Sequence, residues 1–111
     1  MNRERAVRVP VEGVPLRIAA ATGHLVNISA SGALVRATEP LTPRFEYPIY
    51  LDLPTDRVQL TGRVVRTNPA GGEDQPPTQD SYLVAVRFTV LPPTARTAVA
   101  RLCGSAFTLR E

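Results

Sequence analysis

The sequence has no lysine and no tryptophan, and it contains one cysteine and one histidine. A single cysteine excludes an intrachain disulfide. One cysteine with one histidine also falls short of the usual zinc ligand sets, so we expect no metal site. No apolar run approaches the ~20 residues that span a bilayer, and no apolar segment of a secretory signal follows Met1. We therefore expect a cytoplasmic protein without membrane insertion.

The 111 residues are 43% hydrophobic and 21% charged, which is typical of one globular domain, here residues 1–111. All thirteen cations are arginine, and the net charge is +3. The planar guanidinium group suits bidentate recognition of phosphate and of the guanine O6/N7 edge. A GC-rich genome explains the arginine bias equally well. The clustering of Arg3, Arg5 and Arg8 needs a separate account, and we predict a flexible arginine-rich arm over residues 1–12.

Alternation of apolar and polar residues is the main structural signal in the rest of the chain. It predicts half-buried strands at residues 46–53, 57–64 and 81–90. The short turn at Thr55-Asp56 should join the first two of these strands as a hairpin. Weaker strands are expected at residues 16–21, 25–29 and 32–37.

Six short strands about ten residues apart indicate an antiparallel sandwich or barrel, expected over residues 14–90. Between two of the weaker strands, Thr22-Gly23-His24 is predicted as a turn. Residues 68–79 hold three prolines, two adjacent glycines and two acids without apolar periodicity. Such a composition predicts a long mobile loop.

The periodicity changes near the C-terminus. Apolar residues from Ala95 to Ala106 follow the spacing i, i+3, i+4, i+7, i+8, i+11, which predicts an amphipathic helix. Proline and Thr94 suit its start and Gly104 its end, so we expect the helix at residues 93–104, closing one end of the barrel. Cys103 lies on the apolar stripe, which favours a structural thiol over a reactive one.

Catalytic residues are scarce. His24 is the only histidine, and a lone histidine in a turn is more often a surface residue than part of a catalytic triad. No glycine-rich phosphate loop of the Walker or Rossmann type is present. We expect a binding protein without enzymatic activity and without a cofactor.

Residues 27–32, Asn-Ile-Ser-Ala-Ser-Gly, form the most distinctive polar motif. Strand periodicity places Asn27 and Ser29 on one face and turns Ile28 into the core. Both polar side chains donate and accept hydrogen bonds. Gly32 permits a left-handed or closely approached backbone. A flat hydrogen-bonding ligand would fit such a shelf, although a turn closed by Asn and Ser capping explains the motif as well.

Together with the arginine arm, this N-x-S-x-x-G motif resembles the PilZ family. Further similarities are L-T-G-R-V-V-R at residues 60–66 and L-V-A-V-R-F at residues 83–88. The resemblance covers almost the whole chain. It implies a mainly β fold, a six-stranded antiparallel β-barrel of the split-barrel type with a C-terminal α-helix. It also implies a receptor for cyclic di-GMP, in which ligand binding changes the N-terminal arm and so regulates a protein partner.

Carried over residue by residue, Asn27, Ser29 and Gly32 match the second motif, and Arg8 matches the second arginine of the R-x-x-x-R segment. Glu4 stands where the first arginine belongs. The resemblance therefore implies that Arg5 or Arg3 supplies that charge through a shift of the arm. In the family these arginines bind phosphates and guanine edges, while the Asn, Ser and Gly positions contact the remaining guanine.

Two other functions fit the sequence. A PilZ-like protein-interaction module that no longer binds cyclic di-GMP is consistent with Glu4. A small basic barrel that binds RNA or single-stranded DNA is disfavoured, because such sites usually use exposed aromatic residues for stacking, and this chain has six aromatic residues, mostly on apolar strand faces. We therefore expect no nucleic-acid partner. The sequence does not predict the oligomeric state.

Overall fold

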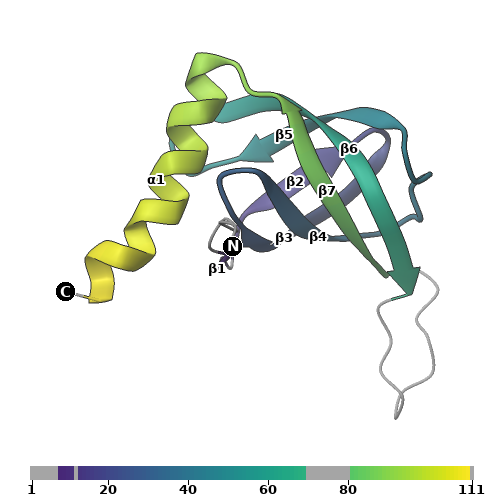
Figure 1. Ribbon diagram of the computed structural model, residues 1–111, viewed down its shortest axis with the longest axis horizontal. Helices are drawn as coiled ribbons and strands as arrows, with labels where there is room; N and C mark the ends of the chain where they lie inside the picture. Colours follow the sequence, from purple (N-terminus) through teal and green to yellow (C-terminus); the bar gives the residue numbers. More distant parts are fainter. Residues whose placement is uncertain (1–7, 12, 70–80, 111) are drawn as a thin grey trace, which may run out of the picture.

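The computed structural model in Figure 1 is a closed β-barrel. Its strands turn apolar side chains at about every second position toward the interior. The structure describes residues 8–11, 13–69 and 81–110. Its elements are β1 (Val9–Pro10), β2 (Pro15–Ile18), β3 (Ala21–Ile28), β4 (Gly32–Ala37), β5 (Glu46–Asp52), β6 (Arg57–Pro69), β7 (Tyr82–Val90) and α1 (Pro93–Arg110).

The sheet closes because β4 pairs with both β7 and β3. Around the barrel the order is β3-β2-β5-β6-β7-β4, and every pairing is antiparallel. The short β1 is an extra strand that pairs with β3 on the side that β2 also uses. Closure pairs the strand edges that an open sheet would leave exposed. The predicted six-stranded barrel with a C-terminal helix is confirmed.

The core lies inside this barrel, and the predicted alternation places most of it correctly. Val58, Leu60 and Val64 of β6 are buried, as are Ile49 and Leu51 of β5. Their polar neighbours point to the outside. The hairpin predicted at Thr55-Asp56 is confirmed, because β5 pairs with β6 and the Leu53 amide donates to the Asp56 carbonyl over 2.8 Å.

The turn predicted at Thr22-Gly23-His24 is wrong. These residues lie within β3, and the chain reverses between β2 and β3 at Ala19-Ala20, where Ala19 has a φ of 56°. The strand predicted at residues 16–21 therefore crosses the reversal. Gly23 is required for a different reason than a turn, since a Cβ there would collide with the carbonyl oxygen of Arg36 on β4.

Other differences between the predicted and observed strands lie where a loop or a flexible arm was predicted. Residues 68 and 69, expected in the long loop, extend β6, while residues 70–80 lie outside the described residues. Val9 and Pro10, expected in the flexible arm, form β1. The strand predicted at residues 32–37 matches β4 in both bounds.

The helix α1 begins at Pro93, as predicted, but continues past Gly104 to Arg110. It lies along one end of the barrel (Figure 1), and Ala95, Ala98 and Val99 pack into the barrel core. Cys103 is only partly buried against this core, and desolvation raises the pKa of its thiol. Among the described residues, no helix is long and apolar enough to cross a bilayer.

Candidate ligand-binding shelf

Strand β1 carries Arg8 to the motif at residues 27–32, which we call the shelf. Val9 pairs with Ile28, Pro10 pairs with Asn27, and the side chain of Val9 is buried. This pairing places Arg8 beside the shelf, where its Nη1 donates to the Oδ1 of Asn27 over 2.9 Å. The structure therefore joins two motifs that lie nineteen residues apart in the sequence.

A β-bulge in β3 sets the direction of Asn27. Leu25 pairs with Val35 and Asn27 with Leu34, so Val26 is an extra residue in the ladder. Leu25 and Ile28 are consequently both buried although they are three residues apart. Strict alternation would place Leu25 and Asn27 on the same face. The bulge instead turns Asn27 to the outside, a usual consequence of an inserted residue.

Ser29 builds the turn of the shelf. Its Oγ accepts hydrogen bonds from the amides of Ser31 and Gly32 at 3.3 and 3.2 Å and lies 3.3 Å from the Gly32 carbonyl, to which it donates. The amide of Ser29 donates to the same carbonyl over 2.8 Å. The side chain is 1% exposed. Its hydroxyl is thus engaged within the turn, as the serine part of the capping interpretation describes, and the prediction that Asn27 and Ser29 share one polar face is wrong.

Gly32 is required by close packing. Its φ lies outside the left-handed region, which among the described glycines is occupied by Gly13. A Cβ at residue 32 would collide with the carbonyl oxygen of Val86 on β7. The left-handed alternative predicted for Gly32 is therefore wrong, and the close-approach alternative is correct. Gly32 itself is buried, so the absence of a side chain serves the close packing of β4 against β7.

Two polar residues at the shelf were missed by the sequence analysis. Arg87 on β7 lies directly opposite Gly32 in the ladder, and its side chain is exposed. Opposite residues on antiparallel strands have Cα atoms about 4.5–5.5 Å apart, so this arginine begins next to Gly32. Ser31 is exposed at the tip of the turn, and its carbonyl accepts from the Phe88 amide over 2.8 Å. Alternation already indicated that Arg87 faces outward, but only the strand pairing brings it to the shelf.

Among the residues that the structure describes, the shelf carries positive charge without an acidic partner. Arg8 bonds to a neutral amide, and neither Arg8 nor Arg87 has an ion-pair partner among the described residues. On the neighbouring strand, Arg63 also pairs with Arg87 in the ladder, but its guanidinium binds Glu46 at 3.0 Å. The guanidinium groups of Arg8 and Arg87, neither paired with a described acid, flank the turn, an arrangement that favours a ligand with more than one negative charge.

Arg3, Arg5 and Glu4 lie outside the described residues, so the register of the arm stays a prediction. Beside the shelf, a hollow of about 370 Å³ opens along β3, and its lining includes Pro10, Val26 and Arg36. In the described ranges, no three His, Cys, Asp or Glu side chains are grouped closely enough to hold a metal ion.

A family model described as the PilZ domain matches residues 2–105 of this sequence. Comparison with curated proteins gives no match. Among solved structures, the PilZ domain of YcgR from Escherichia coli with c-di-GMP is similar, with a TM-score of 0.68 and 14% identity over 94% of this chain and 91% of that chain.

Two longer proteins share the same fold. The K. pneumonia MrkH–c-di-GMP complex has a TM-score of 0.77 and 12% identity, covering 99% of this chain and 55% of MrkH. Escherichia coli YcgR in complex with c-di-GMP has a TM-score of 0.71 and 13% identity, covering 97% of this chain and 47% of that chain. This chain thus spans about half the length of these two proteins.

Proposed function

The chain belongs to the PilZ domain family, and on this premise we propose that it is a cyclic di-GMP receptor with no catalytic activity of its own. The observation that carries the proposal is the hydrogen bond between Arg8 and Asn27, which brings to the shelf a guanidinium group that has no described ion-pair partner. Structures of similar fold that were solved with c-di-GMP support the choice of ligand.

The shelf offers a complementary group for each part of this ligand. Arg8 and Arg87 stand on two sides of the turn and can each bind a phosphate or the O6/N7 edge of guanine. Asn27 accepts from Arg8 through Oδ1, which leaves its amide N–H groups for a guanine acceptor. Ser29 and Gly32 act by shaping the turn, so that the ligand approaches the backbone and the exposed Ser31.

Binding would also change the arm. β1 has only two residues in the ladder and one buried anchor, Val9, which lies outside the continuous barrel core. A short strand of this kind is easily detached, and a ligand that binds both the arm and the shelf stabilises the docked form. The arm would then present a different surface to a protein partner, which is an order–disorder switch.

The acid at position 4 favours a second candidate, a PilZ interaction module without ligand. Micromolar affinity corresponds to about 8 kcal/mol, and one charge-assisted hydrogen bond contributes about 1.5–3 kcal/mol. Replacing one arginine of the family motif by Glu4 would therefore weaken binding by ~10- to several-hundred-fold. Arg5 or Arg3 at that place would restore the affinity, and Arg87 adds a cation that partly offsets the loss.

Calorimetric titration with cyclic di-GMP tests the proposal. We expect saturable heat with a dissociation constant in the micromolar range, about 8 kcal/mol of binding free energy. Arg8→Ala should weaken binding by ~10-fold or more, because it removes a charged contact from the shelf. Arg63→Ala is the matched control, since that arginine lies on the same sheet but is paired with Glu46.

Two results decide between the candidates. Absence of heat at about 100 μM cyclic di-GMP would contradict the receptor and favour the ligand-free module. Equal losses in Arg8→Ala and Arg63→Ala would show that binding follows net charge and does not use the shelf.

A further inference from the structure

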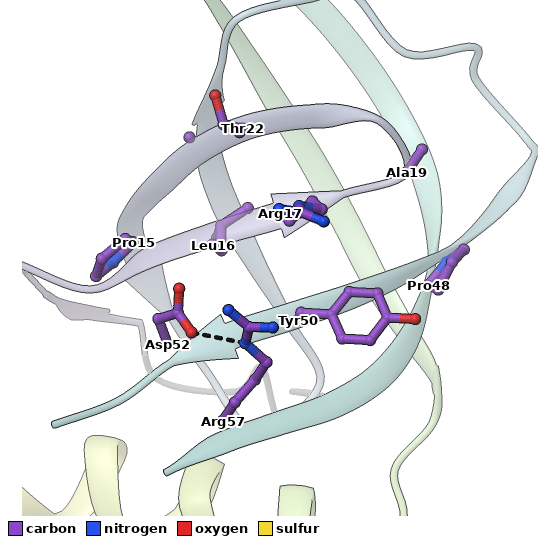
Figure 2. A pocket seen from close by; sticks show the side chains of 10 residues that line it. Pro15, Leu16, Arg17, Ala19, Thr22, Pro48, Tyr50, Asp52 and Arg57 are labelled. Carbon is purple, nitrogen blue, oxygen red and sulfur yellow. Dashed lines mark hydrogen bonds and ion pairs between the residues drawn. The ribbon is translucent and has the colours of Figure 1, made fainter. Parts of the chain in front are cut away.

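A hollow of about 640 Å³ lies on the outer wall of the barrel, at the opposite end of β3 from the shelf (Figure 2). Thr22 lines it, whereas Asn27 of the shelf is five residues further along the same strand. At about 3.3 Å per residue this separates the two sites by ~16 Å. Its lining includes Arg17, Thr22, Tyr50, Asp52 and Arg57. We call this second site the wall hollow.

Charged side chains that line the wall hollow have polar atoms without a described hydrogen-bond or ion-pair partner. The side chain of Arg17 is exposed, with neither hydrogen bond nor ion pair among the described residues. Arg57 donates from Nε to Oδ1 of Asp52 over 2.8 Å, which leaves its Nη groups and the second oxygen of Asp52 without a described partner. Figure 2 shows these free atoms turned toward the same space as Arg17.

An aromatic ring completes the site. Tyr50 is half-buried and lies directly opposite Arg17 in the pairing of β2 with β5. Figure 2 shows its ring extended along the strand toward Pro48, with Arg17 on the neighbouring strand. An accessible ring face beside a free guanidinium group suits a planar group joined to an anion, because the ring stacks while the cation binds the charge.

We propose that the wall hollow is a second binding site that takes a nucleoside monophosphate. Its base stacks on Tyr50, its phosphate binds the guanidinium of Arg17, and its base edge meets the donors of Arg57 and the acceptor of Asp52. The free carboxylate oxygen of Asp52 disfavours a ligand that is only anionic, such as inorganic phosphate. The volume falls within the ~300–1,000 Å³ of small-molecule sites.

The order of donors and acceptors on the Asp52–Arg57 pair also ranks the bases. Guanine presents the O6 acceptor beside N–H donors on one edge, and this order matches a guanidinium beside a carboxylate oxygen. Adenine, cytosine and uracil each present only one donor group on the corresponding edge, whereas guanine presents two beside O6, and the pyrimidines also have a smaller ring to stack. GMP should therefore bind more tightly than AMP, CMP or UMP.

An NMR titration of the full chain tests the site, with amide shifts followed for GMP, AMP, CMP, UMP and inorganic phosphate. We expect GMP to shift the amides of β2 and β5 around Arg17 and Tyr50, with a dissociation constant of ~0.1–1 mM, because few contacts are made in an open site. Arg17→Ala should weaken GMP binding by ~10-fold, and Tyr50→Leu by ~5- to 100-fold. Arg63 is an exposed arginine outside the hollow, so Arg63→Ala should leave the affinity for GMP unchanged.

Several results would overturn the site. They are the absence of shifts up to about 5 mM GMP, equal binding of inorganic phosphate, and shifts produced by an acidic peptide but by no nucleotide. Titration of Arg17→Ala with cyclic di-GMP separates the two proposals. Unchanged affinity there, together with weakened GMP binding, supports a site independent of the shelf, whereas joint loss would mean that both ligands share one site.

Discussion

The two ends of β3 show two ways of building a polar site. At the shelf, the shape of the site depends on a turn and on close backbone packing. Ser29 is buried in the turn that it closes, and Gly32 is packed against the carbonyl of Val86. At the wall hollow, the site is formed by side chains on regular strands, and the exposed Arg17 and Arg57 lie on the outer face of β2 and β6.

Because of this difference, mutations at the two sites should affect folding stability and ligand affinity differently. A change within the shelf turn alters hydrogen bonds and packing that hold β3 to β4, so it should affect folding as well as ligand affinity. A change in the wall hollow removes an exposed side chain whose contribution to stability is small. Arg8 belongs to the second kind, although it lies at the shelf.

The largest effect is expected for Gly32→Ala. The new Cβ would collide with a backbone carbonyl of β7, which cannot move without disturbing the ladder. We expect a loss of about 3 kcal/mol, and a fall in Tm of ~10–20 °C, measured by thermal unfolding followed by circular dichroism. In Gly104→Ala nothing lies within 4 Å of the new Cβ, and this helix position should gain about 0.5–1 kcal/mol. Equal Tm values for these two variants would contradict the packing role of Gly32.

Ser29→Ala should have the next largest effect. It removes the acceptor for the amides of Ser31 and Gly32 inside the turn, and we expect a loss of about 1–2 kcal/mol in urea unfolding. Ser31→Ala is the matched control, because the same chemical change at this exposed position should stay within about 0.5 kcal/mol. If both serines proved equally tolerant, the turn would not depend on the buried hydroxyl.

Asp52→Asn tests the other site of the comparison. It removes the charge of an exposed ion pair with Arg57, and exposed pairs of this kind contribute little to stability. We expect a Tm indistinguishable from that of the unmodified protein in differential scanning calorimetry. A marked fall would mean that the wall hollow is also part of the framework of the barrel.

The smallest effect concerns Cys103, which reports on the packing of α1. Desolvation raises the pKa of its thiol, so less thiolate is present at a given pH in the folded state, and alkylation at pH 8 should be slower than in urea-unfolded protein. The thiol of Cys103 has a higher pKa in the folded than in the unfolded state, so its ionisation lowers the free energy of unfolding. The stabilisation is therefore fully present below the unfolded-state pKa and is lost as the pH rises through the folded-state pKa. Folded protein that reacts as fast as unfolded protein would contradict this packing.

The sequence predicted the fold where alternation was regular. β5 and the first part of β6 bury one face each, and period two describes such strands directly. In β7 the alternation is incomplete, because Val84, Ala85 and Val86 are all buried and Val90 is exposed. The prediction failed at Gly23, which was interpreted as a turn residue although it serves the close approach of Arg36. The true reversal at Ala19-Ala20 contains no residue typical of turns. A glycine in a strand and a glycine in a turn are identical in sequence, and only the strand pairing distinguishes them.

The shelf was predicted in part. The proximity of Arg8 to Asn27 followed from the family resemblance, and the structure places these residues in contact. The bulge at Val26 was not predictable, because it depends on register against β4. The same holds for Arg87, which reaches the shelf only through the pairing of β7 with β4. The binding roles of Arg3, Arg5, Arg8, Asn27, Ser29 and Gly32 stay predictions.

The most direct test of the receptor proposal is amide NMR of the full chain during titration with cyclic di-GMP. The proposal predicts the largest shifts at Arg8, at residues 27–32 and at Arg87, with the amides of β2 and β5 at the wall hollow unchanged. Shifts confined to the wall hollow, or none at all at saturating ligand, would contradict the assignment of the shelf as the cyclic di-GMP site.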